Sequence, residues 1–284
     1  MKKRKKKRIR WNRILFLLIG IIIIIGGSVM GIRYFNNDNK KNRIEDKKNL
    51  SNQSNDDKNV DKKINVDLEK APKSYQEFSN LKDGEYLTDN GYTLKIRDGI
   101  AYIDEHIIVN KTYSVPSNYI PSNAYQEVVG ERCNNCINKD VMDAFRLMQS
   151  DAKAIGLNIY ISSGYRGYTY QDKLYNNYVS ISGKEKADTY SARPGHSEHQ
   201  TGTCFDLNTI DDSFQYTDEG KWVNENAYLY GFIIRYPKGK ESITGYQYES
   251  WHLRYVGKEL AIKLYHDGSW DTLEEYYGIS SSYE

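Results

Sequence analysis

The alternation of apolar and polar positions predicts strands first. Residues 92–97 and 100–103 alternate with the period of two that is typical of half-buried strands. Between them, Asp98 and Gly99 form the dipeptide that favours a tight hairpin turn. We therefore expect a small β-hairpin region over residues 74–115. We assign His106, within that region, a structural role.

A helical period follows Asn138, which is a suitable N-cap residue. Apolar side chains recur every three or four positions and predict one buried face, made by Val141, Phe145, Met148, Ala152 and Ile155. Gly156 is positioned to end this helix.

Short elements without a regular βαβ repeat make up the rest of the chain. Strands are predicted at residues 157–161, 204–207 and 232–235, and a loop at 236–245. Further helices are predicted at three places: one with Leu174, Tyr175 and Tyr178 on its buried side, one around 222–230 and one near 258–265. This pattern is typical of an α+β fold, an antiparallel sheet flanked by helices.

Residues 14–32 form a continuous apolar run without a charge. A helix of this length spans about 28 Å, which is enough for a bilayer core. Residues 1–13 carry nine Lys or Arg and no acid, and a basic flank of this kind stays in the cytoplasm. A cleaved signal peptide is the alternative, but its apolar region is shorter and a small-x-small cleavage site follows it. We therefore expect a single-pass membrane anchor with the rest of the chain outside the cell.

Residues 33–73 are rich in Asn, Lys, Asp and Ser and have few large apolar side chains. Such a segment cannot bury enough surface to offset its ordering entropy, which predicts a disordered polar tether. The formal net charge of the whole chain is +2. Because the basic residues at the start flank the apolar run, we do not expect nucleic acid as a partner.

Two separated segments of the sequence contain candidate metal-binding and catalytic residues. The first holds His199 and Asp206, and the second holds His252 with Glu249 three positions before it. Two imidazoles and one carboxylate form a common catalytic zinc set, with a fourth position left for water. A further carboxylate can act as the proton acceptor for that water. The alternative is that these are scattered solvated or hydrogen-bonded side chains.

The same segments resemble the VanY-type D-alanyl-D-alanine carboxypeptidases, zinc peptidases of peptidoglycan that include related L,D-carboxypeptidases. The resemblance rests on the run Ser-Glu-His-Gln-Thr-Gly before Asp206 and on Tyr-Glu-Ser-Trp-His ending at His252. It also includes Ser-Ser-Gly-Tyr-Arg ending at Arg166, followed by Gln171. It covers roughly residues 107–278.

This resemblance implies a role for each matching residue. His199, Asp206 and His252 would bind one Zn²⁺ per chain, and Glu249 would be the general base. Arg166, Gln171 and Ser197 would contact substrate. Beyond the resemblance, we expect Arg166 to stabilise the oxyanion and Ser197, together with Gln171, to hold the terminal carboxylate of the substrate.

The chain departs from the family pattern at two places. Ser250 stands where the family usually has Pro, and Thr203-Cys204 stands where it has Leu-Ala. Cys204 brings a thiol close to the expected metal. His196 adjoins the site, and we expect it at the rim.

The resemblance predicts a monomeric zinc carboxypeptidase domain over residues 116–284. Its substrate would be a peptidoglycan stem peptide, from which it removes the C-terminal D-alanine by means of a zinc-bound water and Glu249. Three alternatives remain open at this point: an L,D-carboxypeptidase acting on tetrapeptide stems, a peptidoglycan endopeptidase, and a wall-binding module without catalysis.

Cys133 and Cys136 form a C-x-x-C motif apart from these segments. Four interpretations compete: a structural zinc site, a redox pair, a local disulfide and two ordinary thiols. A structural zinc site lacks two further nearby ligands, whereas an extracellular location permits a disulfide.

Overall fold

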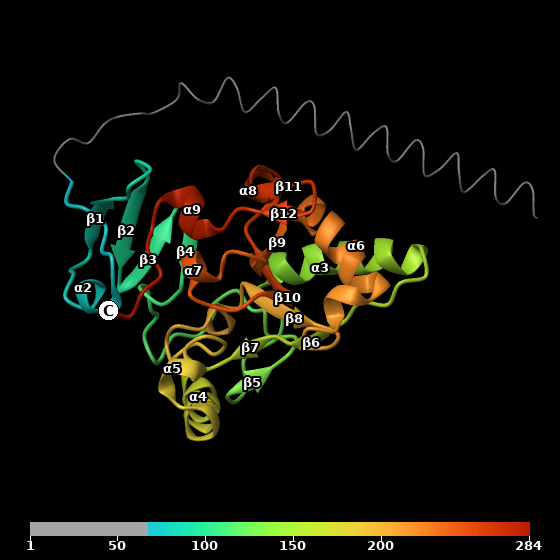
Figure 1. The fold of residues 1–284 in the computed structure, drawn as a ribbon, viewed down its shortest axis with the longest axis horizontal. Helices are drawn as coiled ribbons and strands as arrows, with labels where there is room; N and C mark the ends of the chain where they lie inside the picture. The colour runs from blue at the N-terminus through green and yellow to red at the C-terminus, as the bar shows by residue number, and fades with distance from the viewer. Residues whose placement is uncertain (1–67) are drawn as a thin grey trace, which may run out of the picture. The chain divides into compact units, whose positions relative to one another are not determined.

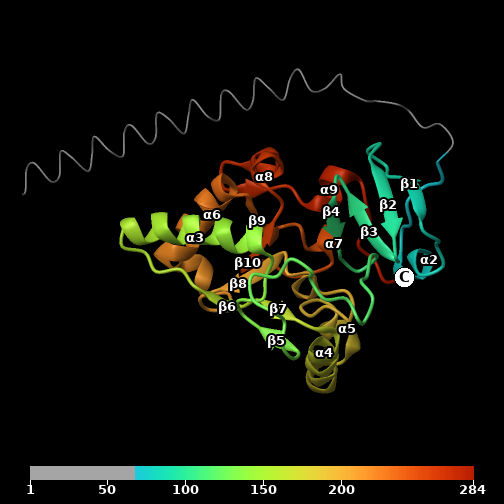
Figure 2. The same cartoon turned by 180° about the vertical axis from the view of Figure 1, so that it is seen from behind.

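The structure, a computed structural model, describes residues 68–284, which contain two four-stranded antiparallel sheets with helices around them (Figures 1 and 2). Within this range no helix has the length and apolar character needed to cross a bilayer. The basic segment and the anchor predicted at residues 1–32 lie outside the described residues, as does the tether as far as residue 67.

The first sheet is a simple meander in the order β1-β2-β3-β4. Its strands are β1 (Gly84–Leu87), β2 (Thr93–Arg97), β3 (Ile100–Ile103) and β4 (His106–Ile108), and the short helix α2 (Tyr75–Phe78) precedes it. The predicted hairpin is confirmed as β2 and β3. Asp98 and Gly99 between them both have positive φ, 52° and 71°, as a type I′ turn requires.

The chain is already packed against this sheet before residue 74. The Leu87 amide donates to Glu69 O at 2.7 Å, and the Ala71 amide donates to Leu87 O at 2.9 Å. Ala71 is buried. The part of the predicted tether that the structure describes, residues 68–73, therefore follows the edge of the sheet.

The second sheet has the order β6-β8-β10-β9, and its neighbours pair antiparallel, as predicted. Its strands are β6 (Ile161–Ser163), β8 (Cys204–Leu207), β10 (Glu249–Tyr255) and β9 (Phe232–Tyr236). Phe205 on β8 packs its ring edge against Phe145, with ring centroids 5.1 Å apart. Because side chains alternate along a strand, Cys204 and Asp206 lie on the opposite face. One face of the sheet thus packs into the apolar core, and the other face presents Cys204 and the polar side chain of Asp206.

The rest of the chain forms helices and short pairs of strands, most of them around the second sheet (Figure 1). The helices are α3 (Lys139–Ala154), α4 (Tyr168–Ser182), α5 (Lys184–Ala187), α6 (Asp218–Asn226), α7 (Glu241–Thr244), α8 (Lys258–Leu264) and α9 (Leu273–Tyr277). Three 3-10 turns are η2 (Glu198–Thr201), η3 (Phe214–Tyr216) and η4 (Ala227–Tyr230). The strand pairs are β5 (Arg132–Cys133) with β7 (Tyr165–Arg166), and β11 (Tyr265–His266) with β12 (Ser269–Trp270).

The first long helix, α3, confirms the predicted helix with one exception. Val141, Phe145, Met148 and Ala152 are buried, but Ile155 is 54% exposed. The reason is that Ile155 is the C-cap, with φ −106° and ψ 13°, so its side chain leaves the helical stripe.

The strand predicted at 157–161 is wrong for most of its length, because β6 begins only at Ile161. Its partner strand β8 ends at Leu207, and Asn208 then turns with a positive φ of 45°. Asn208 bonds to Tyr160 through its own backbone and side chain, which replaces a continued ladder.

Three smaller predictions also need correction. The helix predicted around 222–230 is α6 followed by the separate turn η4, and the loop predicted at 236–245 contains α7. The helix predicted near 258–265 ends at Leu264, because Tyr265 is extended at φ −95° and ψ 127° and begins β11.

The C-terminal segment returns to the first sheet, where Figure 1 shows the chain end beside α2. The Tyr75 amide donates to Ser282 O at 2.9 Å, and the Asp89 amide donates to Gly278 O at 3.0 Å. The first and last described segments therefore share one packing unit.

Candidate catalytic metal site

Two facing strands bring Asp206 and His252 together. Asp206 on β8 is the direct partner of His252 on β10 in the antiparallel register. Directly opposite side chains on one face of a sheet have Cβ atoms only about 5 Å apart. Here His252 Nδ1 lies 3.2 Å from Asp206 Oδ1, and both residues are buried. The register of the sheet therefore builds this half of the site.

His199 reaches the same place from η2, the turn that leads into β8. Gly202 ends this turn with φ 71°, and a Cβ there would lie 3.0 Å from Asn138 Oδ1. His199 Nδ1 lies 2.6 Å from Gly164 O. Since a carbonyl can only accept, Nδ1 carries the proton and Nε2 keeps its lone pair. That nitrogen lies 3.3 Å from Asp206 Oδ2.

Two atoms at this point lack the partners that buried polar groups normally have. His199 Nε2 and Asp206 Oδ1 are buried and find no hydrogen-bond partner within residues 68–284. Most buried polar atoms in proteins are paired, and an exception calls for an explanation such as an ion. One nitrogen lone pair and one carboxylate oxygen are a suitable start for a metal site. The residues present therefore fit a zinc ion.

The donors form two overlapping groups. His199, Cys204 and His252 place ligand atoms within 4.8 Å of one another, and so do Asp206, Glu249 and His252. Asp206 touches both imidazoles, one with each oxygen. Cys204 is fully buried and does not line the pocket described below. Asp206 therefore links the two imidazoles on the side that is open to a ligand.

Glu249, the first residue of β10, lies beside this group. Its Oε2 is 3.7 Å from His252 Nδ1, and its side chain is 13% exposed. Burial raises the pKa of Glu249 to about 7; His252 opposes this shift and the Asp206 carboxylate adds to it. A bound cation would lower this pKa again. Glu249 is thus a carboxylate that can exchange a proton near neutral pH.

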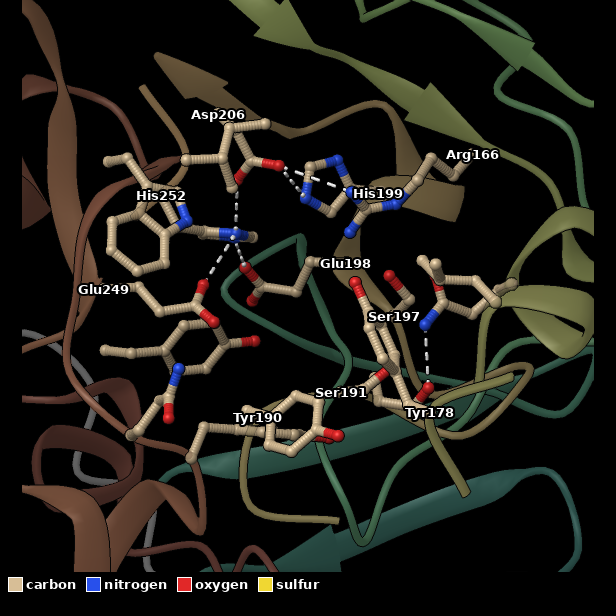
Figure 3. A pocket seen from close by; sticks show the side chains of 18 of the residues that line it. Arg166, Tyr178, Tyr190, Ser191, Ser197, Glu198, His199, Asp206, Glu249 and His252 are labelled. Atoms are coloured by element: carbon tan, nitrogen blue, oxygen red, sulfur yellow. Dashed lines mark hydrogen bonds and ion pairs between the residues drawn. The ribbon is translucent and has the colours of Figure 1, made fainter. Parts of the chain in front are cut away.

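Arg166 supplies the positive charge of the site. It lies on β7, and its Nη1 donates to Ser163 Oγ at 3.0 Å and to Asp206 Oδ2 at 3.3 Å. Its side chain is 18% exposed, and the residue lines the pocket described below. Figure 3 shows Arg166 on the same side as His199, across from Glu249.

All the site residues predicted from the sequence line one pocket of about 320 Å³: Arg166, Gln171, Ser197, His199, Asp206, Glu249 and His252. Gln171, on α4, is buried, and its Nε2 donates to Ala192 O at 2.7 Å. Its Oε1 has no hydrogen-bond partner in the described part of the chain. Ser197 is buried just before η2. Tyr178 and Tyr190 line the side of the pocket that lies across from Asp206 (Figure 3).

Cys133 and Cys136 form a disulfide, which confirms one of the four interpretations of the motif. Within the loop that it closes, Asn134 Nδ2 donates to Ser162 O at 3.0 Å. A Cβ at position 164 would lie 2.3 Å from Asn134 O, so only glycine fits there. The disulfide loop thus packs directly on Gly164, whose carbonyl holds the His199 ring.

The comparisons with known proteins agree on one family. The family model described as VanY, D-alanyl-D-alanine carboxypeptidase, matches residues 134–258. YodJ of Bacillus subtilis (strain 168) is 42% identical over 219 residues, which cover 70% of this chain and 78% of that protein. The chain belongs to the VanY family. It is therefore a carboxypeptidase, a peptidase hydrolase.

Among the solved structures that are similar to this VanY-family chain, two are informative here. The LdcB LD-carboxypeptidase is 40% identical with a TM-score of 0.56, and the match covers 67% of this chain and 95% of that one. A vancomycin-resistance D,D-pentapeptidase VanY in complex with Zn(II) is 36% identical with a TM-score of 0.50, and the match covers 60% and 97%. The mixed fold with antiparallel sheets is thus common to VanY-type and LD-carboxypeptidases.

One residue of this VanY-family carboxypeptidase lies elsewhere than predicted from the sequence, and another at the site was not predicted. His196, expected at the rim, is buried away from the pocket; its Nδ1 lies 2.9 Å from Asn110 O. Glu198 lines the pocket and lies 3.4 Å from His252 Nε2. Its position beside His199 was the only available signal, because its partners Arg235 and Arg254 are distant in the sequence.

Proposed function

We propose that this carboxypeptidase is a zinc enzyme that removes the C-terminal D-alanine from peptidoglycan stem peptides. His199, Asp206 and His252 hold the metal in this proposal. The observation that carries it is the pair of buried atoms without hydrogen bonds, His199 Nε2 and Asp206 Oδ1, at the wall of the pocket. The VanY structure in complex with Zn(II) supports the choice of metal.

In the proposed reaction, proton transfer and charge stabilisation fall to different side chains of this protein. When bound, zinc supplies a Lewis acid and makes a water nucleophilic near neutral pH. Glu249 accepts a proton from the attacking water and passes it to the leaving amine nitrogen. Arg166 stabilises the negative charge that develops on the carbonyl oxygen. Its Nη1 is already aimed at this region through its bond to Asp206 Oδ2.

Recognition of the substrate terminus falls to Ser197 and Gln171. The Ser197 hydroxyl donates to the free terminal carboxylate. Gln171 uses one Nε2 hydrogen on Ala192 O and presents an unpaired Oε1, which is suited to accept a peptide N–H. A substrate that continued past this point would leave buried polar groups unpaired, which favours an exopeptidase.

An L,D-carboxypeptidase acting on tetrapeptide stems is the second candidate. It is favoured by the LdcB LD-carboxypeptidase, whose identity of 40% and TM-score of 0.56 exceed the 36% and 0.50 of the D,D-pentapeptidase VanY.

A digest of defined stem peptides by the purified full chain tests both candidates. We expect a pentapeptide ending in D-Ala-D-Ala to lose one D-alanine, measured by mass spectrometry, and its C-terminal amide to react far more slowly. Release of D-alanine from the tetrapeptide alone would assign the enzyme to the L,D class. Equal cleavage of the amide would contradict the exopeptidase, and full activity after removal of zinc by a chelator would contradict the metal mechanism.

A further inference from the structure

Glu198 is a fully buried carboxylate that the proposed reaction leaves without a role. It opens η2, directly before His199, and it is 1% exposed. Its Oε2 lies 3.4 Å from His252 Nε2. Figure 3 shows Glu198 beside the His252 ring, joined to it by a contact of its own.

The other oxygen of Glu198 is held by two arginines. Arg235 Nε donates to Oε1 at 2.8 Å, and Arg254 Nη1 donates to the same atom at 3.0 Å. Both arginines are 1% exposed. Because Oε1 already has two charge-assisted donors, only Oε2 remains available for His252.

Glu274 on α9 completes a balanced group of charges. It accepts from Arg235 Nη1 at 2.9 Å and from Nη2 at 2.7 Å, and it does so from a buried position. Two buried carboxylates therefore match two buried guanidinium groups. Such a group is costly to desolvate and is weak evidence for stability by itself. Its precise placement against His252 requires a further explanation.

The two nitrogens of His252 face different surroundings. Nδ1 lies 3.2 Å from Asp206 Oδ1 and 3.7 Å from Glu249 Oε2, at the proposed metal site. Nε2 faces Glu198 instead. A ring nitrogen binds a metal through its lone pair, so the ring proton must be on the other nitrogen. The acceptor next to Nε2 decides which arrangement is favoured.

We infer that Glu198 is a positioning residue that accepts the Nε2–H of His252 and so turns the Nδ1 lone pair toward the metal. This inference rests on the proposed zinc site. The two arginines keep Glu198 in place and offset its charge, so it remains an acceptor. Carboxylate partners of this kind orient metal-binding histidines, and their loss commonly weakens metal binding 10–100-fold.

The alternative is that Glu198 only neutralises the arginines. Glu274 provides a matched control, because it pairs with Arg235 in the same buried group and, within residues 68–284, makes no hydrogen bond or ion pair with His252. In Glu198→Gln, the arginines attract the amide oxygen, which leaves the amide NH₂ facing His252 Nε2. A donor would then face a donor, and the ring proton would be driven to Nδ1. Glu274→Gln makes the same change of charge, but its amide NH₂ would face Arg235 or Asn110 and not His252.

The test compares the zinc dissociation constants of wild type, Glu198→Gln and Glu274→Gln by competition with a chromogenic chelator, using the full chain. We expect about 10–100-fold weaker zinc binding in Glu198→Gln and affinity close to wild type in Glu274→Gln. The melting temperatures of both metal-free variants should fall by similar amounts. Wild-type affinity in a folded Glu198→Gln, or an equal loss in Glu274→Gln, would overturn the inference.

A second measurement avoids substitution and covers the case in which a variant fails to fold. In the zinc-loaded wild type with ¹⁵N-labelled histidine, we expect the His252 proton on Nε2, exchanging slowly with solvent. A proton on Nδ1 would overturn the inference while leaving zinc binding itself intact. Absence of stoichiometric zinc from the wild type, or its retention by His199→Ala, would overturn the proposed metal site and with it this role for Glu198.

Discussion

Asp206 and His252 lie directly opposite each other on the neighbouring antiparallel strands β8 and β10. A shift of one residue in this register would turn one of the two side chains to the apolar face. The pairing of Leu253 with Phe205, the next pair along the sheet, helps to fix the register through the core. The packing of the sheet and the geometry of the site are therefore set by the same register.

The first prediction separates the two overlapping donor groups. We expect Asp206→Asn to lose zinc, because Asp206 joins both imidazoles at the pocket. We expect Cys204→Ala to retain about one zinc per chain, because Cys204 does not line the pocket. Metal analysis of the dialysed proteins measures both. The reverse result would make the thiol the third ligand.

The second prediction concerns Glu249. Glu249→Gln should keep its zinc and its fold but slow turnover by roughly 10²–10⁴, which is the usual contribution of general acid–base catalysis. Steady-state kinetics on the preferred stem peptide, with zinc content measured in parallel, would test it. Turnover near the wild-type rate would mean that another group takes the proton.

The third prediction concerns the disulfide. The double variant Cys133→Ser/Cys136→Ser should lose about 2 kcal/mol of unfolding free energy, from the loop-closure entropy of so short a loop. Because the loop packs on Gly164, the variant should also bind zinc more weakly through His199. Denaturant unfolding and chelator competition measure the two effects. In the double variant, a reducing agent should have no further effect.

The fourth prediction is a dependence of stability on pH. Burial lowers the pKa of His196 to about 4, although its hydrogen bond to Asn110 acts in the opposite direction. In the unfolded chain the value is about 6.5. Between these two values the unfolded state binds more protons, so stability falls as the pH drops from about 6.5 to about 4. Urea unfolding should show this loss, and His196→Gln should show less of it. An equal slope in both proteins would assign the effect to other groups.

The fifth prediction concerns topology, which we propose from the sequence alone. If residues 14–32 anchor the chain and residues 33–67 form a polar tether, protease added outside intact cells should release the catalytic domain. Cleavage should stop before Glu69, because Glu69 and Ala71 are bonded to Leu87. A domain that is protected until the membrane is broken would require the opposite orientation.

Much of the fold could be predicted from local pattern. The strand predicted at 204–207 is confirmed residue for residue as β8, since a buried apolar run with an Asp at a fixed place is a strong signal. The start of β6 could not be predicted, because it depends on the turn at Asn208, directly after the neighbouring strand β8. α9 was missed because it has only five residues and its place depends on the distant contact between Glu274 and Arg235.

The candidate site, like the fold, could be predicted from the sequence only in part. The seven predicted residues line one pocket. They come from three sequence motifs, around Arg166, His199 and His252, and the resemblance to the VanY family was needed to identify them. The contact between Glu198 and His252 could not be predicted, since it follows from the register of β10 and from the position of η2. Physical neighbours that are far apart in sequence leave no local signal.

The return of the C-terminal segment to the first sheet has a consequence for the order of assembly during synthesis. Two segments made early, α2 and the turn after β1, are bonded to residues made last, because the Tyr75 amide donates to Ser282 O and the Asp89 amide donates to Gly278 O. Arg235 likewise gains its hydrogen bonds to the Glu274 carboxylate only after α9 has been made. A ribosome makes the N-terminal part first, and domains usually begin to fold in that order. Here α2 and the turn after β1 gain these two backbone partners only when the last residues emerge, so a chain cut short before α9 would lack those bonds and the Glu274 carboxylate that pairs with Arg235.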